Sequence, residues 1–108
     1  LIKDAENGNK HAMYELGKHY FYGKKGFKED SKEAYEWFKK ANAKGSVMGM
    51  AREGACLLHG FGVEKDEVTG MLYLGAAECQ GSDVAAYYIG RYFYKRRENP
   101  NKKMLARK

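Results

Sequence analysis

The sequence contains few side chains that could bind a transition metal. It has two cysteines, Cys56 and Cys79, and three histidines, His11, His19 and His59. Zinc sites usually draw their ligands from a C-x2-C pair or from two residues four positions apart on one helix. The sequence has no C-x2-C pair, and none of these five residues lies four positions from another of them. We therefore interpret the histidines as surface or groove residues and expect neither a metal site nor a cofactor.

The two cysteines are predicted to be reduced. A disulfide requires Cα atoms within about 7 Å of each other. If the chain turns near Val63 between two helices, Cys56 and Cys79 lie at different heights of the pair, roughly 13 Å apart along the helix axis. We expect two free, partly buried thiols, since a free cysteine behaves as a small hydrophobic residue.

Other catalytic arrangements are also missing from the sequence. Ser31, Ser46 and Ser82 fall at predicted turns between helices, where serine caps a helix, and no nucleophile elbow surrounds them. The Gly-Lys-Lys-Gly and Gly-Phe-Gly stretches lack the spacing of a phosphate-binding loop. Acidic pairs such as Asp66-Glu67 lie at predicted helix starts, where negative charge favours the helix dipole. The sequence therefore predicts a protein that is not an enzyme.

The net charge of +6 is concentrated at the C-terminal end of the chain. Residues 95–108 contain seven basic residues and one acidic residue, whereas residues 1–94 contain 13 of each and sum to zero. A nucleic-acid groove needs positive charge spread along one face, so this distribution argues against that function. No apolar run approaches the roughly 18 residues of a membrane span, and no charged-then-apolar leader is present.

Glycines recur along the whole chain with a nearly constant period. Gly8, Gly45 and Gly81 are 37 and 36 residues apart, and each is followed nine residues later by another glycine. These second glycines are Gly17, Gly54 and Gly90. Further along each period comes a small residue, which is Ala34, Gly70 or Ala106, and in the first two periods an aromatic residue follows it, Trp37 or Tyr73. Such a period indicates stacked supersecondary units.

Each unit is predicted to consist of a helix, a loop and a second helix. Ala12, Leu16 and Tyr20 have helical spacing, and the glycines that follow favour a helix end. Ser31 or Asp30 can cap the second helix, and no segment alternates polar and apolar residues as a strand would.

The glycines inside the predicted first helices need a structural reason, because each costs about 1 kcal/mol relative to alanine. We expect Gly17, Gly54 and Gly90 to lie where the second helix of each unit crosses, opposite Ala34, Gly70 and Ala106. Because one unit cannot bury its own apolar face, the units should stack into an all-α, right-handed α/α solenoid whose first helices line an inner curve.

This pattern resembles the Sel1-like repeat family, a relative of the tetratricopeptide repeats. The first unit matches at Gly8, Ala12, Leu16-Gly17, Tyr20, Gly23, Gly26, Asp30, Ala34, Trp37, Ala41 and Gly45. The second unit matches at Gly54, Gly60 to Val63, Asp66, Tyr73, Ala76-Ala77 and Gly81, and departs at Gly49, Glu53, Leu57 and Gly70. The third matches at Ala85, Ile89-Gly90 and Phe93 before its loop loses the glycines. The resemblance divides the chain into about two and a half repeats, at residues 8–44, 45–80 and 81–108, after a tail at 1–7 from a preceding unit.

The resemblance implies a non-catalytic scaffold or adaptor that binds a protein or peptide. Cysteine-rich relatives bridge adjacent helices and have been linked to hydrolysis of cell-wall-like amides or β-lactams, but neither their cysteine pattern nor a nucleophile with its base is present here. The sequence allows two compartments. The small number of cysteines is consistent with a reducing cytoplasm, and export also occurs in the family.

Carrying over tetratricopeptide geometry places five positions of each first helix on the inner face. These are His11, Tyr14, Lys18, Phe21 and Tyr22 in the first unit; Met48, Ala51, Ala55, Leu58 and His59 in the second; and Val84, Tyr87, Arg91, Tyr94 and Lys95 in the third. Two aromatic, basic clusters around an apolar floor would suit the core of an interface. The alternative is that the aromatic residues pack on neighbouring helices.

Two further readings use the C-terminal third of the chain. In the first, nucleic acid binds through base stacking on tyrosines and through basic residues that hold phosphates: Lys95, Arg96, Arg97, Lys102, Lys103, Arg107 and Lys108. In the second, the incomplete third repeat exposes Tyr88, Tyr92 and Met104, and the chain associates end to end with another copy.

Overall fold

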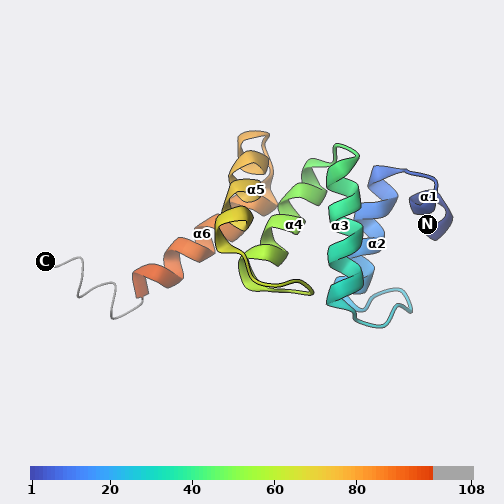
Figure 1. Ribbon diagram of the computed structural model, residues 1–108, viewed down its shortest axis with the longest axis horizontal. Helices are drawn as coiled ribbons and strands as arrows, with labels where there is room; N and C mark the ends of the chain where they lie inside the picture. The colour runs from blue at the N-terminus through green and yellow to red at the C-terminus, as the bar shows by residue number, and fades with distance from the viewer. Residues whose placement is uncertain (99–108) are drawn as a thin grey trace, which may run out of the picture.

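The computed structural model describes residues 1–98 of the chain, and its regular secondary structure over this range is entirely α-helical (Figure 1). The helices are α1 (Ile2–Glu6), α2 (Lys10–Tyr22), α3 (Ser31–Ala43), α4 (Val47–His59), α5 (Glu67–Cys79) and α6 (Asp83–Glu98). The predicted all-α fold is confirmed. None of the described helices combines the length and the hydropathy that crossing a membrane would require.

Side chains at the turns fix where the helices begin. Asp30 accepts a hydrogen bond from the backbone N–H of Glu33, and Ser46 accepts one from Gly49. Of the two cap residues that the sequence allowed for α3, Asp30 is therefore the one used. The first helices of the two units end at Gly23 and Gly60, whose φ angles of 67° and 76° are ones that glycine adopts readily.

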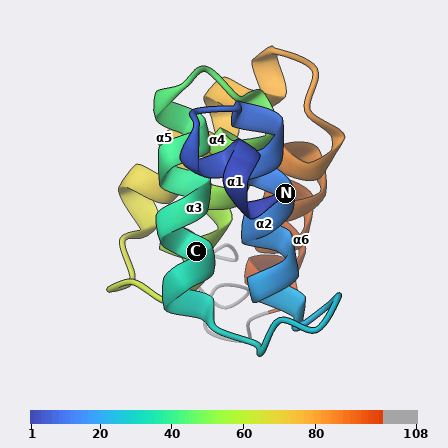
Figure 2. The ribbon, with the colours of Figure 1, turned by 90° about the vertical axis from the view of Figure 1, so that its right-hand side faces the viewer.

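The helices form two rows. Along the chain, α2 packs against α3, α3 against α4, α4 against α5, and α6 against both α4 and α5. Viewed along the array, α3 and α5 lie on one side and α2 and α6 on the other (Figure 2). The short α1 packs against α2 and buries Ala5 completely.

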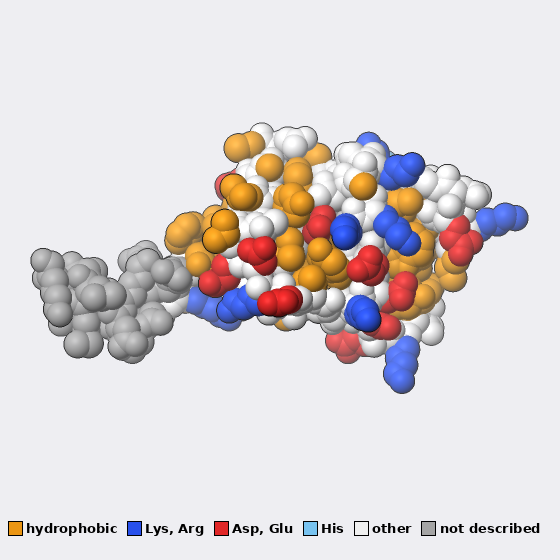
Figure 3. Space-filling view, viewed as in Figure 1, with side chains coloured by type: hydrophobic (Ala, Val, Ile, Leu, Met, Phe, Trp, Pro, Cys, Tyr) orange, Lys and Arg blue, Asp and Glu red, His pale blue; other side chains and the backbone are white. Residues whose placement is uncertain are grey.

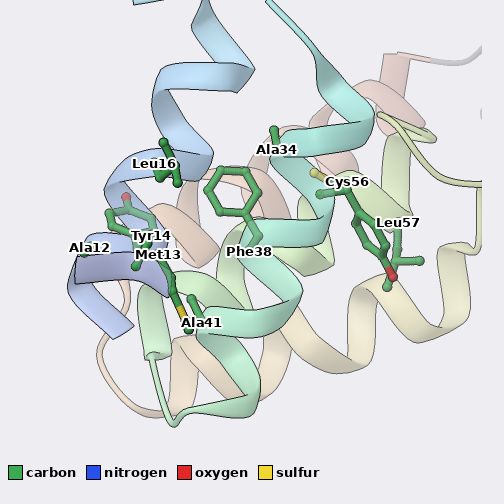
Figure 4. Packing of buried hydrophobic residues seen from close by; sticks show 11 residues of the cluster. Ala12, Met13, Tyr14, Leu16, Ala34, Phe38, Ala41, Cys56 and Leu57 are labelled. Carbon is green, nitrogen blue, oxygen red and sulfur yellow. The ribbon is translucent and has the colours of Figure 1, made fainter. Parts of the chain in front are cut away.

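Two apolar clusters hold the rows together, and α4 belongs to both. In the first, Phe38 of α3 reaches toward Leu16 of α2, and α4 contributes Cys56 and Leu57 (Figure 4). In the second, α4 contributes Ala51 and Leu58, which pack with residues of α5 and α6: Leu74, Ala77 and Ala85. Burial of each large side chain stabilises the fold by roughly 1.5–3 kcal/mol.

The glycines inside the first helices mark close helix contacts, as expected, with one difference. A Cβ at Gly54 would lie 2.9 Å from the carbonyl oxygen of Gly70, which is the predicted crossing. A Cβ at Gly17 would lie 2.7 Å from the ring of Phe38, so Gly17 makes room for an aromatic ring and its predicted neighbour Ala34 is not the closest contact. No described atom would lie within 4 Å of a Cβ at Gly90, whose predicted partner Ala106 is outside the described residues.

The outer faces of α3 and α5 differ in chemistry although they occupy equivalent places in the two units. The exposed positions of α3 carry Lys32, Glu36 and Lys40, whereas those 36 residues later on α5 carry Val68, Leu72 and Ala76. Val68 and Leu72 are 74% and 67% exposed. Hydrophobic side chains accordingly gather over α5 and the adjoining part of α6 (Figure 3).

Candidate functional site: an aromatic and basic groove

A groove forms where the C-terminal ends of α2 and α4 approach α6. It encloses about 290 Å³. We define it by its lining residues: Phe21, Tyr22, His59, Phe61, Tyr87, Tyr88, Arg91 and Lys95. Two adjoining hollows share part of this lining, one reaching Arg52, Asp83 and Val84, and the other reaching Gly90 and Tyr94 along α6. The three hollows form one continuous surface over three helices.

The aromatic rings of the groove contact one another from one helix to the next. Phe21 of α2 meets Phe61 edge-on, with ring centroids 5.6 Å apart. Phe61, in the loop after α4, lies 5.2 Å from His59, and His59 lies 6.1 Å from Tyr88 of α6. Aromatic pairs in such tilted arrangements are favourable beyond the area that they bury. The rings therefore form a pre-arranged apolar wall.

Arg52 of α4 ties the two sides of this wall together. Its Nη1 donates to the hydroxyl oxygen of Tyr22 at 2.8 Å and to that of Tyr88 at 3.4 Å. The guanidinium carbon also lies 5.7 Å from the centroid of the Tyr22 ring. One side chain in the middle helix thus connects the helices on either side of it, and we regard Arg52 as a positioning residue.

Helix α6 also brings exposed positive charge to the groove. Arg91 donates from Nη1 to the hydroxyl of Tyr87 at 2.8 Å, and its guanidinium lies 5.6 Å from the Tyr87 ring. Lys95 follows one turn later on the same helix and is exposed. Among residues 1–95, whose side chains the structure describes, the ion pairs are Lys18 with Glu15 and Lys65 with Glu67, so Arg91 and Lys95 have no carboxylate partner within that range.

The pKa of His59 reports this positive environment. Partial burial lowers its pKa, and the charges of Lys95, Lys65 and Arg91 lower it further, while Glu67 opposes them. The imidazole is therefore neutral near pH 7, with one nitrogen able to donate and the other able to accept a hydrogen bond.

Six of the fifteen positions predicted for the inner face come together in the groove. They are Phe21, Tyr22, His59, Tyr87, Arg91 and Lys95. Tyr94 lines the adjoining hollow on α6. His11, Lys18 and Met48 lie elsewhere: His11 and Met48 are exposed near the starts of α2 and α4, and the ammonium of Lys18 lies 5.1 Å from the Tyr14 ring.

The expectation that Tyr14, Ala51 and Leu58 line the inner face is wrong. Tyr14 is 7% exposed and its ring lies 6.0 Å from that of Phe38, while Ala51 and Leu58 are 0% and 1% exposed. Ala55, which belonged to the same predicted floor, is also buried. Ala51 and Leu58 are covered because α4 packs against α5 and α6 at these positions. Tyr14 is covered because its ring packs on Phe38 of α3.

The residues that line this surface without having been predicted for the inner face include Arg52, Phe61 and Tyr88. Arg52 and Tyr88 are each one position beyond a predicted outward residue, a rotation of about 100° around the helix. Phe61 belongs to the Gly-Phe-Gly stretch, which was assigned to loop structure alone. A signal was available at Arg52, whose charge interrupts the small and apolar residues of the Met-Ala-Arg-Glu-Gly-Ala stretch.

Neither of the two cysteines lines the groove. Cys56 is buried, and burial raises the pKa of its thiol to about 12, whereas Cys79 is free and exposed rather than partly buried. Over residues 1–98, no three histidine, cysteine or acidic side chains cluster as metal ligands would. Tyr88 and Tyr92, predicted to contact another copy, are half-buried, and Met104 lies outside the described residues, as do Lys102, Lys103, Arg107 and Lys108.

Helix pairs stacked in one direction, with a glycine at the tight contact of each pair, define an α-helical repeat array. The Sel1 repeat model matches the sequence twice, at residues 10–46 and 47–82, and the chain belongs to the Sel1 repeat family. A solved structure of a Sel1 repeat protein from Oxalobacter formigenes superposes with a TM-score of 0.73 at 30% identity, over 82% of this chain and 25% of that one. The predicted family is confirmed.

Two curated proteins of Arabidopsis thaliana are similar in sequence. The ERAD-associated E3 ubiquitin-protein ligase component HRD3A is 37% identical over 62 residues, which is 57% of this chain and 9% of that protein. Component HRD3B is 35% identical over 69 residues, 64% of this chain and 10% of that protein. The chain thus spans about a tenth of the length of these relatives.

Proposed function

We propose that this chain is a non-catalytic protein-interaction module, and that a partner polypeptide binds in the groove formed by α2, α4 and α6. The observation that carries the proposal is the convergence of aromatic rings and unpaired cations, from separate helices, on one solvent-accessible surface. Exposed tyrosine and arginine are the residue types that contribute most to protein interfaces.

The rigidity of the groove supports the same function. Arg52 bonds the tyrosines at its two sides, and Phe21 packs against the first apolar cluster, so several contact residues are held in place before a partner arrives. A surface that needs little ordering keeps more of its contact energy as affinity. The similarity to ligase components points in the same direction, because a named component of a larger ligase works alongside other proteins.

The test is selection of binders with the whole 108-residue chain, using a displayed library of random peptides of about twelve residues, long enough to cross the groove. Peptides that bind the wild-type chain are then measured against Tyr87→Ala. We expect a loss of affinity of at least about tenfold. The matched control is Val68→Ala on the outer face of α5, which removes an exposed apolar side chain without touching the groove. Equal binding by all three chains would contradict the proposal.

Nucleic acid is the competing ligand class. Tyr87 and Arg91 could stack on bases, but most of the basic residues assigned to phosphates lie outside the described residues. A single-stranded RNA oligonucleotide therefore belongs in the same assay. Tight, Tyr87-dependent binding of RNA that falls steeply with salt would replace the protein-interaction proposal.

A further inference from the structure

We propose that the polypeptide bound in the groove is an acidic segment, with carboxylates that flank an apolar anchor side chain. This inference rests on the proposed function and adds the chemistry of the partner. Its starting point is a mismatch in charge: among residues 1–95, whose side chains the structure describes, the groove is lined by two exposed cations and no acidic residue.

The cations are placed to receive two carboxylates together. Arg91 and Lys95 are four residues apart on α6, which puts them on one face of the helix with Cβ atoms about 5–6 Å apart. In an extended peptide, two side chains on the same face are separated by about 7 Å. Arg91 is already oriented by its bond to Tyr87, and its remaining guanidinium donors suit a carboxylate.

The anchor would lie against the rings beside these cations. His59, Phe61 and Tyr88 contact one another in series, and Phe21 continues the wall on α2. An aliphatic or aromatic side chain of the partner would bury its surface there, and His59 offers neutral hydrogen-bonding atoms to the partner backbone.

The surface also has a direction. Asp83 lines the adjoining hollow next to Arg52, at the other end of α6 from Lys95. Because Asp83 offsets the charge of Arg52, a carboxylate of the partner is attracted less there than near Arg91 and Lys95. The bound segment should therefore carry its carboxylates toward the C-terminal end of α6.

Charge distribution favours a polypeptide over a nucleic acid. Residues 1–94 carry equal numbers of acidic and basic side chains and so supply no net positive charge to a track along the array. A nucleic acid with a charge on every phosphate needs such a track, whereas one or two carboxylates need only Arg91 and Lys95.

The experiment compares the composition of the selected peptides with the effect of reversing one charge. Among peptides whose binding depends on Tyr87, we expect enrichment of aspartate and glutamate next to an apolar residue. Their affinity should fall at least about tenfold in Arg91→Glu. Lys39→Glu, which makes the same charge change on the exposed face of α3, is the matched control and should bind normally. Raising the salt from about 0.05 M to about 0.5 M should weaken the acidic peptides and spare their amide counterparts.

The possible results distinguish failure of the acidic-partner proposal from failure of the proposed interaction module. Tyr87-dependent peptides with no excess of acidic residues, or equal effects of Arg91→Glu and Lys39→Glu, would overturn the acidic partner and leave the interaction module standing. Peptide binding that never depends on Tyr87 would remove both proposals. Tyr87-dependent binding of an RNA oligonucleotide in place of peptides would also remove both.

Discussion

Arg52 and Tyr22 are thirty residues apart in sequence, and Nη1 of the arginine donates a 2.8 Å hydrogen bond to the hydroxyl of the tyrosine. Tyr22 is the last residue of α2 and Arg52 lies in the middle of α4, so the bond joins the first helices of two successive repeats. The same guanidinium also reaches Tyr88 of α6. The wall of the groove is therefore fixed by a side chain that belongs mostly to the interior.

Replacement of Arg52 tests this role. Arg52→Met should lower the free energy of unfolding by roughly 1–2 kcal/mol, because two tyrosine hydroxyls lose their donor. Urea unfolding of the single variants and of the double variant with Tyr22→Phe measures the coupling, which we expect at about 0.5–1.5 kcal/mol. Strict additivity of the two changes would show that the bond contributes nothing to stability.

Two glycines offer a matched test of the close helix contact. Gly54→Ala should destabilise the chain by about 1–3 kcal/mol, because the new methyl group meets the carbonyl oxygen of Gly70 and the side chain of Leu74. Gly75→Ala, on the facing helix with no atom within 4 Å of its added Cβ, should stabilise by up to about 1 kcal/mol. Thermal unfolding of both variants gives the comparison, and a shift in the same direction for both would refute the crossing.

The two tyrosines once assigned to the same face should behave differently. Tyr14→Ala removes a buried ring that packs on Phe38 and should cost about 3–5 kcal/mol. Tyr87→Ala removes a ring that is 56% exposed and should change stability by no more than about 0.5 kcal/mol. Urea unfolding of each variant decides the matter. If both unfold the chain, Tyr87 belongs to the core and the groove is not a free surface.

Alkaline titration tests the buried pair of Tyr35 and Glu53. Burial first, and then the nearby carboxylate of Glu53, raises the pKa of Tyr35 from 10.0 to about 12. The unfolded chain loses this proton near pH 10 while the folded chain keeps it, so the contribution to stability is present below pH 10 and is lost as the pH rises toward 12. Tyr35→Phe should therefore show a shallower fall in unfolding free energy between about pH 9.5 and 11.5 than the wild type. Parallel curves would contradict the raised pKa.

The outer face of α5 should tolerate charge. Val68→Lys combined with Leu72→Glu introduces the residue types that α3 carries at the equivalent places, Lys32 and Glu36, and both sites are largely exposed. We expect a change in unfolding free energy within about 0.5 kcal/mol per site. A loss of several kcal/mol on thermal or urea unfolding would show that this face is covered in solution.

The glycine period was sufficient to predict the architecture. It fixed the helix pairs, the Gly54–Gly70 crossing and the family, because glycine at a tight contact is demanded by sterics that operate within each repeat. The groove was predictable only in part. Tyr87 and Arg91 were found because α6 has an open side, whereas Ala51 and Ala55 occupy the same repeat positions on α4 and are covered. The position of a residue in the repeat predicts which side of its helix the side chain is on. It does not predict whether a neighbouring helix covers that side.

The shared use of α4 by both apolar clusters has a consequence for how the array loses its structure. A chain of separate modules would unfold one module at a time. Here unfolding of α2 and α3 would expose one flank of α4, and unfolding of α5 and α6 would expose the other. The interface between neighbouring repeats then contributes more to the free energy of unfolding than either repeat contributes alone. The two repeats at residues 10–82 should accordingly unfold in a single transition when the chain is denatured. The fluorescence of Trp37, in the first repeat, and the helix content of the whole chain should then give the same midpoint.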